Sequence, residues 1–446
     1  FNHLIIKYFD HTFIKQVALA AQRGGMHATP LASKWTDGGE RVYEAFTAGS
    51  KKSKLISYKS LFTQEYKRIS HLMGTVADEI DKLVKSGDLH ADNSQLSAYL
   101  WKFSMAFKSN QTDLKKVDRM WQKLDELCRE LPNGVNTVLH PQGTSSVAGD
   151  ADKVDVELRL GLRTADTKQL EAYMVEFQLQ AQKVFDECKK NRNKNECISP
   201  KPLIDDTVVT TGPNLFWNTR GESDSNSCLI HPNTISEFAI NLEVPLLEFV
   251  LNVKKVDLKI YAQAAKIDTA AHETAHGIFS TETESVNKRI GAGTAADTLE
   301  ETKAELGAVY LYKDVKWGDT EESNTKMRKY LVYAKIGTLL GYLGYKNKEG
   351  SSGRYYYTAI YILHKLVRAG FITMSADGLG LHVDGATQVD AIIKLLSDQA
   401  HDQFEYYAGT DISPHRVKEG IEGIKKLEQD TIINSIVKKV RESRFN

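Results

Sequence analysis

The chain has 446 residues, and its charge and composition exclude several classes of protein. Lysine and arginine together number 58, as do aspartate and glutamate, so the net charge is zero and no overall positive field favours nucleic acid. With 41% hydrophobic residues the chain can build its own core, yet no stretch reaches the roughly 20 apolar residues of a membrane span. We therefore expect a soluble, self-folding protein with neither a nucleic-acid nor a membrane partner.

The N-terminal half of the chain predicts a mixture of helices and strands. Apolar residues at three- to four-residue steps indicate amphipathic helices, which we place at 54–86, 93–108, 113–131 and 167–190. Alternation of apolar and polar residues indicates half-buried strands, which we place at 154–162, 208–211 and 237–242. The segment 211–233 is rich in glycine, asparagine and serine and predicts an irregular loop.

From about residue 245 onward the sequence predicts almost only helix. The expected helices are 246–279, 298–313, 323–340, 354–369, 387–407 and 414–443, and the glycine-rich stretch 341–353 predicts a loop. We therefore expect a predominantly α-helical α+β fold. It would consist of a mixed α/β N-terminal lobe over 1–235 and a helical C-terminal lobe over 236–446.

The four cysteines leave the cellular compartment open. No C-x-x-C pair occurs, which argues against a cysteine zinc site or a redox motif. Cys188 and Cys197 flank a short polar run and would close a small disulfide loop in a secreted protein. Free thiols in a reducing compartment are the preferred interpretation. The sequence thus favours a cytoplasmic location, with secretion as the alternative.

The sharpest chemical signal is an H-E-x-x-H motif, formed by His272, Glu273 and His276. On a helix the two histidines lie one turn apart and point the same way, so both imidazoles can reach one metal ion. Glu273 is offset by about 100° from His272, which places it beside the ion as a base for a water at the metal. An ordinary exposed helix turn would produce the same letters, so the motif needs a third ligand.

Three carboxylates lie in one short stretch downstream, Glu300, Glu301 and Glu305. An exposed charged face is the ordinary interpretation of such a stretch. However, Glu301 and Glu305 share one helix face, where like charges repel unless a positive group lies opposite. A divalent ion bound by one of them, and the second nitrogen of a ligand histidine held by the other, would supply that group. We assign Glu301 as the third metal ligand and expect Glu305, with Glu300, to surround the ligands without binding the ion. Two imidazoles and one carboxylate suit Zn²⁺.

A weaker signal lies just before a later apolar helix, where Arg354, Tyr355 and Tyr357 occur together. A zinc hydrolase needs a donor for the oxyanion that develops on the substrate, and these side chains carry such donors. The alternative is that the aromatic residues belong to the core.

The succession of H-E-T-A-H at 272–276 and E-E-T-K-A-E at 300–305 resembles the dipeptidyl peptidase III family (M49) of zinc metallopeptidases. That family typically has one more residue between the histidines and the second motif E-E-C-R-A-E. The resemblance covers roughly 240–446. It implies a two-lobed peptidase whose helical lobe holds zinc through His272, His276 and Glu301, with Glu273 as base, and which releases dipeptides from short peptides.

We predict a zinc-dependent hydrolase, foremost a peptidase with short peptides as substrates. Two alternatives stay open from the sequence. One is a diverged relative that hydrolyses a non-peptide ester, lactone or amide. The other is a non-catalytic protein that keeps a metal ion for structure.

Overall fold

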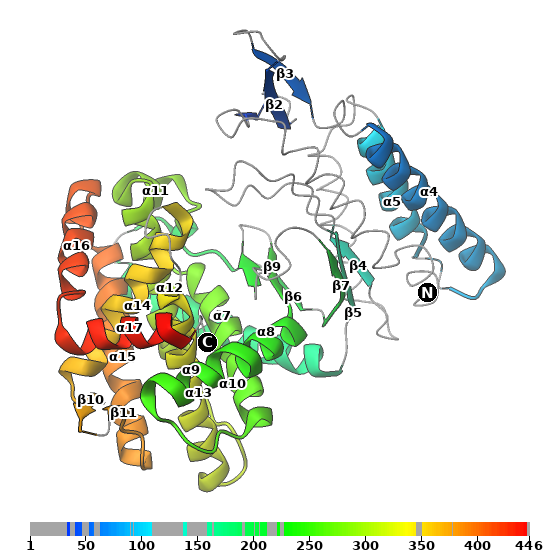
Figure 1. Ribbon diagram of the computed structural model, residues 1–446. Helices are drawn as coiled ribbons and strands as arrows, with labels where there is room; N and C mark the ends of the chain where they lie inside the picture. Colours follow the sequence, from blue (N-terminus) through cyan, green and yellow to red (C-terminus); the bar gives the residue numbers. More distant parts are fainter. Residues whose placement is uncertain are drawn as a thin grey trace. The chain divides into compact units, whose positions relative to one another are not determined.

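The computed structural model divides the chain into two compact units, Phe1–Thr164 with Thr207–Asn218, and Ala165–Asp206 with Thr219–Asn446 (Figure 1). The structure describes residues 34–35, 41–46, 53–57, 63–89, 91, 93–108, 137–140, 158–162, 165–189, 192–199, 201–204, 206–211, 221–223, 227–344, 350–376 and 378–443. The predicted helix 113–131 lies outside these residues. The expected fold class is confirmed, because the described part is predominantly helical α+β.

The first unit contains a helical pair and short strands. Its described elements are β1 (Lys34–Trp35), β2 (Arg41–Phe46), β3 (Ser53–Ser57), α4 (Thr63–Ser86), α5 (Asn93–Lys108), β4 (Thr137–His140), β5 (Leu158–Leu162) and β7 (Asp206–Thr211). The strands form the sheets β1-β2-β3 and β4-β5-β7. Helices α4 and α5 pack together by burying Val76, Ile80 and Leu100. The predicted helix 54–86 therefore starts too early, because 53–57 pairs as a strand with β2.

The second unit holds most of the helices, drawn in green to red in Figure 1. Its strands are β6 (Lys201–Ile204), β8 (Gly221–Ser223), β9 (Ser227–Ile230), β10 (Ile372–Ser375) and β11 (Gly378–Leu381). Its longer helices are α7 (Ala165–Cys188), α9 (Val244–Leu251), α10 (Leu258–His276), α12 (Thr294–Tyr312), α13 (Glu321–Leu343), α14 (Gly350–Arg368), α15 (Ala386–Ala408), α16 (Pro414–Leu427) and α17 (Thr431–Ser443). One continuous apolar core joins them.

The helix predicted over 246–279 is in fact two helices, α9 and α10. Asn252 ends α9 in the left-handed region with φ 54°, a conformation that asparagine tolerates at helix ends. Asp257 then begins α10 by accepting a hydrogen bond from the backbone N–H of Ile260 at 3.3 Å. The predicted helix 414–443 divides in the same way, because Asp430 caps the start of α17 at Ile432.

The strand predicted over 237–242 is wrong. Pro232 opens a helix, α8 (Pro232–Phe238), which continues through a π-turn (Ala239–Glu243) into α9. Ile235 and Ala239 are fully buried and lie four residues apart, as a helix face requires. Over so short a run, alternation of apolar and polar residues does not distinguish a strand from a helix.

Two predicted loops are also wrong in part. The segment 211–233 contains β8 and β9, which join β6 in the order β6-β9-β8. The loop predicted over 341–353 is too long at both ends, because α13 continues to Leu343 and α14 begins at Gly350. The hairpin β10–β11 was not predicted. None of the helices in the described part of the chain combines the length and the hydropathy of a membrane-spanning segment.

The border between the units differs from the expected one at 235/236. Helix α7 and strand β6 group with the helical unit although both precede residue 235. Helix α7 packs against α10 and α15, and the rings of Phe185 in α7 and Phe279 after α10 lie 4.9 Å apart. Cys188 and Cys197 are both free thiols.

Loss of one buried ion pair is expected to weaken this unit. Arg289 donates to both oxygens of Glu196, at 2.7 and 3.2 Å, and the side chain of Glu196 is only 1% exposed. Burial raises the pKa of Glu196, but the hydrogen bonds from Arg289 and Ser285 outweigh it and lower the pKa below its ordinary 4.5. The pair therefore stabilises the fold above about pH 4.5, and its contribution is lost as the pH falls below that value.

We expect Arg289→Met to cost about 3 kcal/mol at neutral pH, because it leaves a buried carboxylate without its cation. Thermal unfolding between pH 3 and pH 7 measures this effect. The difference between wild type and variant should shrink toward pH 3. A difference that grows in acid would contradict the assignment.

Candidate metal centre

Helix α10 carries the first motif on a buried face. Thirteen of its residues from Tyr261 to Ala275 are buried, among them His272, which is 8% exposed, and Glu273, which is 7% exposed. His276 is the last helical residue, and Gly277 caps the helix. A Cβ on Gly277 would lie 2.1 Å from the carbonyl oxygen of Ile198, whose N–H donates to the Gly277 carbonyl at 2.8 Å. Only glycine fits this approach, which fixes the end of the helix that bears the histidines.

Helix α12 approaches α10 closely because small residues line their contact. A Cβ on Gly307 would lie 2.8 Å from Cβ of Ala275, so a larger residue at 307 would push the helices apart. Ala271 and Ala304 are also fully buried. This approach brings the second motif against the first and buries Glu300, Glu301 and Glu305.

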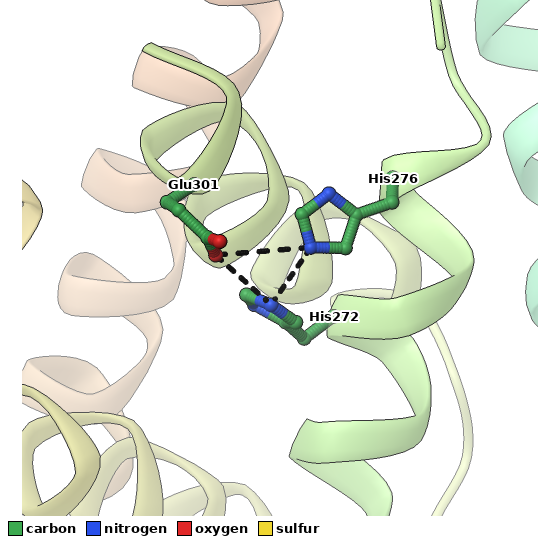
Figure 2. Close-up of side chains that lie close together, drawn as sticks. All are labelled: His272, His276 and Glu301. Carbon is green, nitrogen blue, oxygen red and sulfur yellow. Dashed lines mark hydrogen bonds and ion pairs between the residues drawn. The ribbon is translucent and has the colours of Figure 1, made fainter. Parts of the chain in front are cut away.

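Three donor atoms from the two helices converge on one point (Figure 2). Nε2 of His272 lies 3.1 Å from Nε2 of His276 and 3.5 Å from Oε2 of Glu301, and the third distance, from His276 Nε2 to Glu301 Oε2, is 3.7 Å. These are the three residues that the sequence proposes as ligands. The structure thus brings them together from two helices.

The outer nitrogens of both histidines face carboxylates. Nδ1 of His276 lies 2.9 Å from Oε1 of Glu300, and Nδ1 of His272 lies 3.2 Å from Oε1 of Glu305. A carboxylate at Nδ1 favours the proton on that nitrogen and leaves the Nε2 lone pair free to bind a cation. The structure thus brings Glu300 to His276 and Glu305 to His272.

The carboxylates of the cluster stay ionised at neutral pH. Burial raises the pKa of Glu301, but the neighbouring imidazoles of His272 and His276 and the guanidinium of Arg354 outweigh it and bring the pKa to about 2. Burial likewise raises the pKa of Glu300, and the ammonium of Lys303 more than offsets this. Nζ of Lys303 lies 2.9 Å from Oε1 of Glu300.

The three weaker candidates divide between two places. Nε of Arg354 lies 3.2 Å from Oε1 of Glu301, and an Nη of Arg354 donates to the Tyr355 hydroxyl at 2.9 Å. Arg354 and Tyr355 thus lie beside the cluster. Tyr357 is 7% exposed, and Nζ of Lys425 lies 5.8 Å from its ring. Residues two apart on a helix differ by about 200°, so Tyr355 and Tyr357 cannot both face the cluster.

The donor set fits a divalent ion of zinc's size. Four-coordinate zinc at about 2.0–2.1 Å places its ligand atoms roughly 3.3–3.4 Å apart, close to the three distances in the cluster. Among the described residues, the buried Oε2 of Glu301 accepts no hydrogen bond from any protein group. A buried carboxylate oxygen in that state is costly unless a cation meets it.

The charge around the cluster also favours a cation. In the described part of the chain the buried acids are Asp268, Glu273, Glu300, Glu301 and Glu305, and the buried ammonium groups are those of Lys303 and Lys335, with the half-buried guanidinium of Arg354 beside them. Burial lowers the pKa of His272, but this surplus of carboxylates outweighs it and raises the pKa well above its ordinary 6.5.

Comparison with solved structures supports the fold. The structure of DPP III from Caldithrix abyssi superimposes with a TM-score of 0.59 at 17% identity, over 90% of this chain and 72% of that one. Dipeptidyl-peptidase III from Corallococcus sp. strain EGB gives a TM-score of 0.54 at 14% identity, over 94% of this chain and 73% of that one. The chain has a dipeptidyl peptidase III-like fold. Neither a family model nor a curated protein matches the sequence.

Sequence reasoning missed a second set of buried groups behind the motifs. The Tyr407 hydroxyl donates to Oε2 of Glu300 at 3.1 Å. Lys303, noted only as a neighbour of the glutamates, is fully buried and also donates to the carbonyl of His276 at 3.2 Å. Lys335 and Tyr342 contact Glu305 in the same way. A single lysine inside the apolar run 331–343 was the available signal for Lys335.

Proposed function

We propose that the protein is a zinc-dependent hydrolase, and more specifically a peptidase that acts on short peptides. The observation that carries the proposal is the convergence of His272 Nε2, His276 Nε2 and Glu301 Oε2 on one point. The likeness to solved dipeptidyl peptidases III supports the choice of a peptide as substrate. Glu273 directly follows the first histidine, as the base of an H-E-x-x-H site does.

The chain's own residues supply binding and proton transfer. When bound, zinc would act as a Lewis acid toward a carbonyl oxygen and make a nearby water more acidic. Glu273 takes one proton from the attacking water as the water oxygen adds to the carbonyl carbon. Glu273 then gives that proton to the amine nitrogen as the C–N bond breaks. The acid and the amine products together contain the atoms of the peptide and the water.

Arg354 helps to orient the carboxylate of Glu301, the third proposed ligand. Its guanidinium contacts Oε1, whereas Oε2 faces the histidines. A carboxylate held at one oxygen by a cation presents the other oxygen in a fixed direction. Arg354 therefore favours binding of the ion through a single oxygen of Glu301.

Turnover of a defined substrate panel tests the proposal. Zinc-loaded protein is offered short peptides with free N-termini, the same peptides with acetylated N-termini, and small aryl esters. We expect hydrolysis of peptides, loss of at least about 100-fold in rate on chelation, and recovery on adding zinc. Mass spectrometry of the products identifies the bond that is cleaved.

The panel also separates the alternatives. Hydrolysis of the esters without any peptide cleavage would favour a diverged, non-peptide hydrolase. Tightly bound zinc without hydrolysis of any member would favour a structural metal site with a closed fourth position.

A further inference from the structure

A buried lysine lies behind the proposed metal centre. Lys335 comes from α13, which carries none of the proposed ligands, and its residue is 1% exposed. Its Nζ contacts Oε2 of Glu305 and lies 3.1 Å from Oδ2 of Asp268. An ammonium group between two carboxylates has its charge compensated, which is the condition for burying a lysine so deeply.

Helix α13 holds both oxygens of Glu305. Lys335 contacts Oε2, and the hydroxyl of Tyr342 donates to Oε1 at 2.8 Å. The two residues are seven positions apart, about two helical turns, so they lie on one face of α13. Oε1 of Glu305 is also the atom that lies 3.2 Å from Nδ1 of His272. The carboxylate is thus fixed between α13 and the histidine.

Asp268, the second carboxylate at Lys335, lies on α10 and is held by a residue of α12. Asp268 lies one turn before His272 in α10, and the Tyr312 hydroxyl of α12 donates to its Oδ1 at 3.2 Å. The side chain of Lys335 is therefore tied to α10 through Asp268 and to α12 through Glu305. Three helices meet at one buried ammonium.

We propose that Lys335 and Tyr342 position His272 for metal binding by holding Glu305 against its outer nitrogen. The inference rests on the proposed metal site. Residues that orient ligand histidines are typically worth 10- to 100-fold in metal affinity. His276 has its own support, Glu300, but Lys303 holds that carboxylate from the same helix. On that side Tyr407 of α15 also donates to Glu300, whereas on the His272 side two residues of one helix, α13, hold both oxygens of Glu305.

Zinc affinity of the full chain tests the assignment. The double variant Lys335→Met with Asp268→Asn removes one cation and one anion, so the net formal charge of the cluster stays as in wild type. We expect zinc to bind about 10- to 100-fold more weakly in competition with a chromophoric chelator. We also expect the visible absorption of the cobalt(II)-loaded protein to change, because His272 no longer has a fixed orientation. The single variant Lys335→Arg keeps a positive charge at this position and should bind zinc more tightly than the double variant does.

Arg328→Met is the matched control, because Arg328 lies on the same helix α13 and its ion pair, with Asp390 at 2.8 Å, takes no part in the cluster. Equal loss of zinc affinity in this control would mean that general loosening is responsible, and would overturn the inference. Unchanged affinity and spectrum in the double variant would also overturn it. If the double variant does not fold, Tyr342→Phe decides, since it removes one hydroxyl and should weaken zinc binding several-fold. Absence of zinc binding by wild type would instead refute the proposed function.

Discussion

Replacing Glu273 with glutamine is expected to lower kcat/KM by about 100- to 10,000-fold while zinc stays bound. The amide is nearly the same size as the carboxylate, so the buried helix face of α10 should pack as before. It cannot take a proton from water, and the chemical step then proceeds without its base. Activity assays on zinc-loaded protein, with the metal content measured on the same samples, test this expectation.

Glu248→Gln provides the control, because Glu248 is exposed on α9 in the same unit. It should retain wild-type turnover. Full activity in the Glu273 variant would refute the assigned base, whereas loss of zinc together with activity would show a structural effect of the substitution.

Replacing His276 with alanine is expected to remove the metal and with it all zinc-dependent turnover. The variant leaves two of three converging donors, and the buried Oε2 of Glu301 loses the cation that would compensate it. Zinc at 100 times its dissociation constant stabilises a folded protein by about 2.7 kcal/mol. In a unit of this size that corresponds to a thermal midpoint roughly 5–10 °C higher.

The measurement is a thermal melt with and without chelator. Wild type should lose its midpoint shift on chelation, and the His276 variant should show no response to either chelator or zinc. His364→Ala is the control, since His364 lies 3.9 Å from Asp430 and takes no part in the cluster. A zinc-dependent shift that survives in the His276 variant would place the metal elsewhere.

The convergence of the proposed ligand residues could be predicted in part because their geometry is local. A spacing of four on one helix places His272 and His276 together, and the same spacing places Glu301 with Glu305. The sequence offered a reason to bring the two helices together, namely that carboxylates sharing a face need an opposing cation. The sequence did not show that small residues allow the two helices to approach each other closely. Gly307 and Ala275 were informative only once α10 and α12 were seen to touch there.

Lys335 and Tyr407 were not predicted because their roles depend on contacts between distant parts of the chain. Lys335 lies 30 residues after Glu305 and Tyr407 lies 107 residues after Glu300. Spacing within a helix identifies a shared face but does not say which other helix that face meets. Only the packing of α13 against α10 and of α15 against α12 places these groups at the glutamates.

The errors in the fold have similar causes. The break before α10 had a local signal in Asn252 and Asp257, which a continuous apolar pattern outweighed. Strands β6, β8 and β9 are short. Strand β6 pairs with β9, which lies more than twenty residues further along the chain, and β8 pairs with β9 as well. Their pairing depends on tertiary contacts and not on the pattern of any one segment.

The convergence of His272, His276 and Glu301 has a consequence for the order of folding. These residues belong to helices that follow one another closely along the chain, with only α11 (Glu284–Ile290) and short connections between them. Closing so short a stretch costs little chain entropy. We expect the α10–α12 region to acquire affinity for its ion early, before the C-terminal helices arrive. Docking of α13 would then convert a loose chelate into a rigid one.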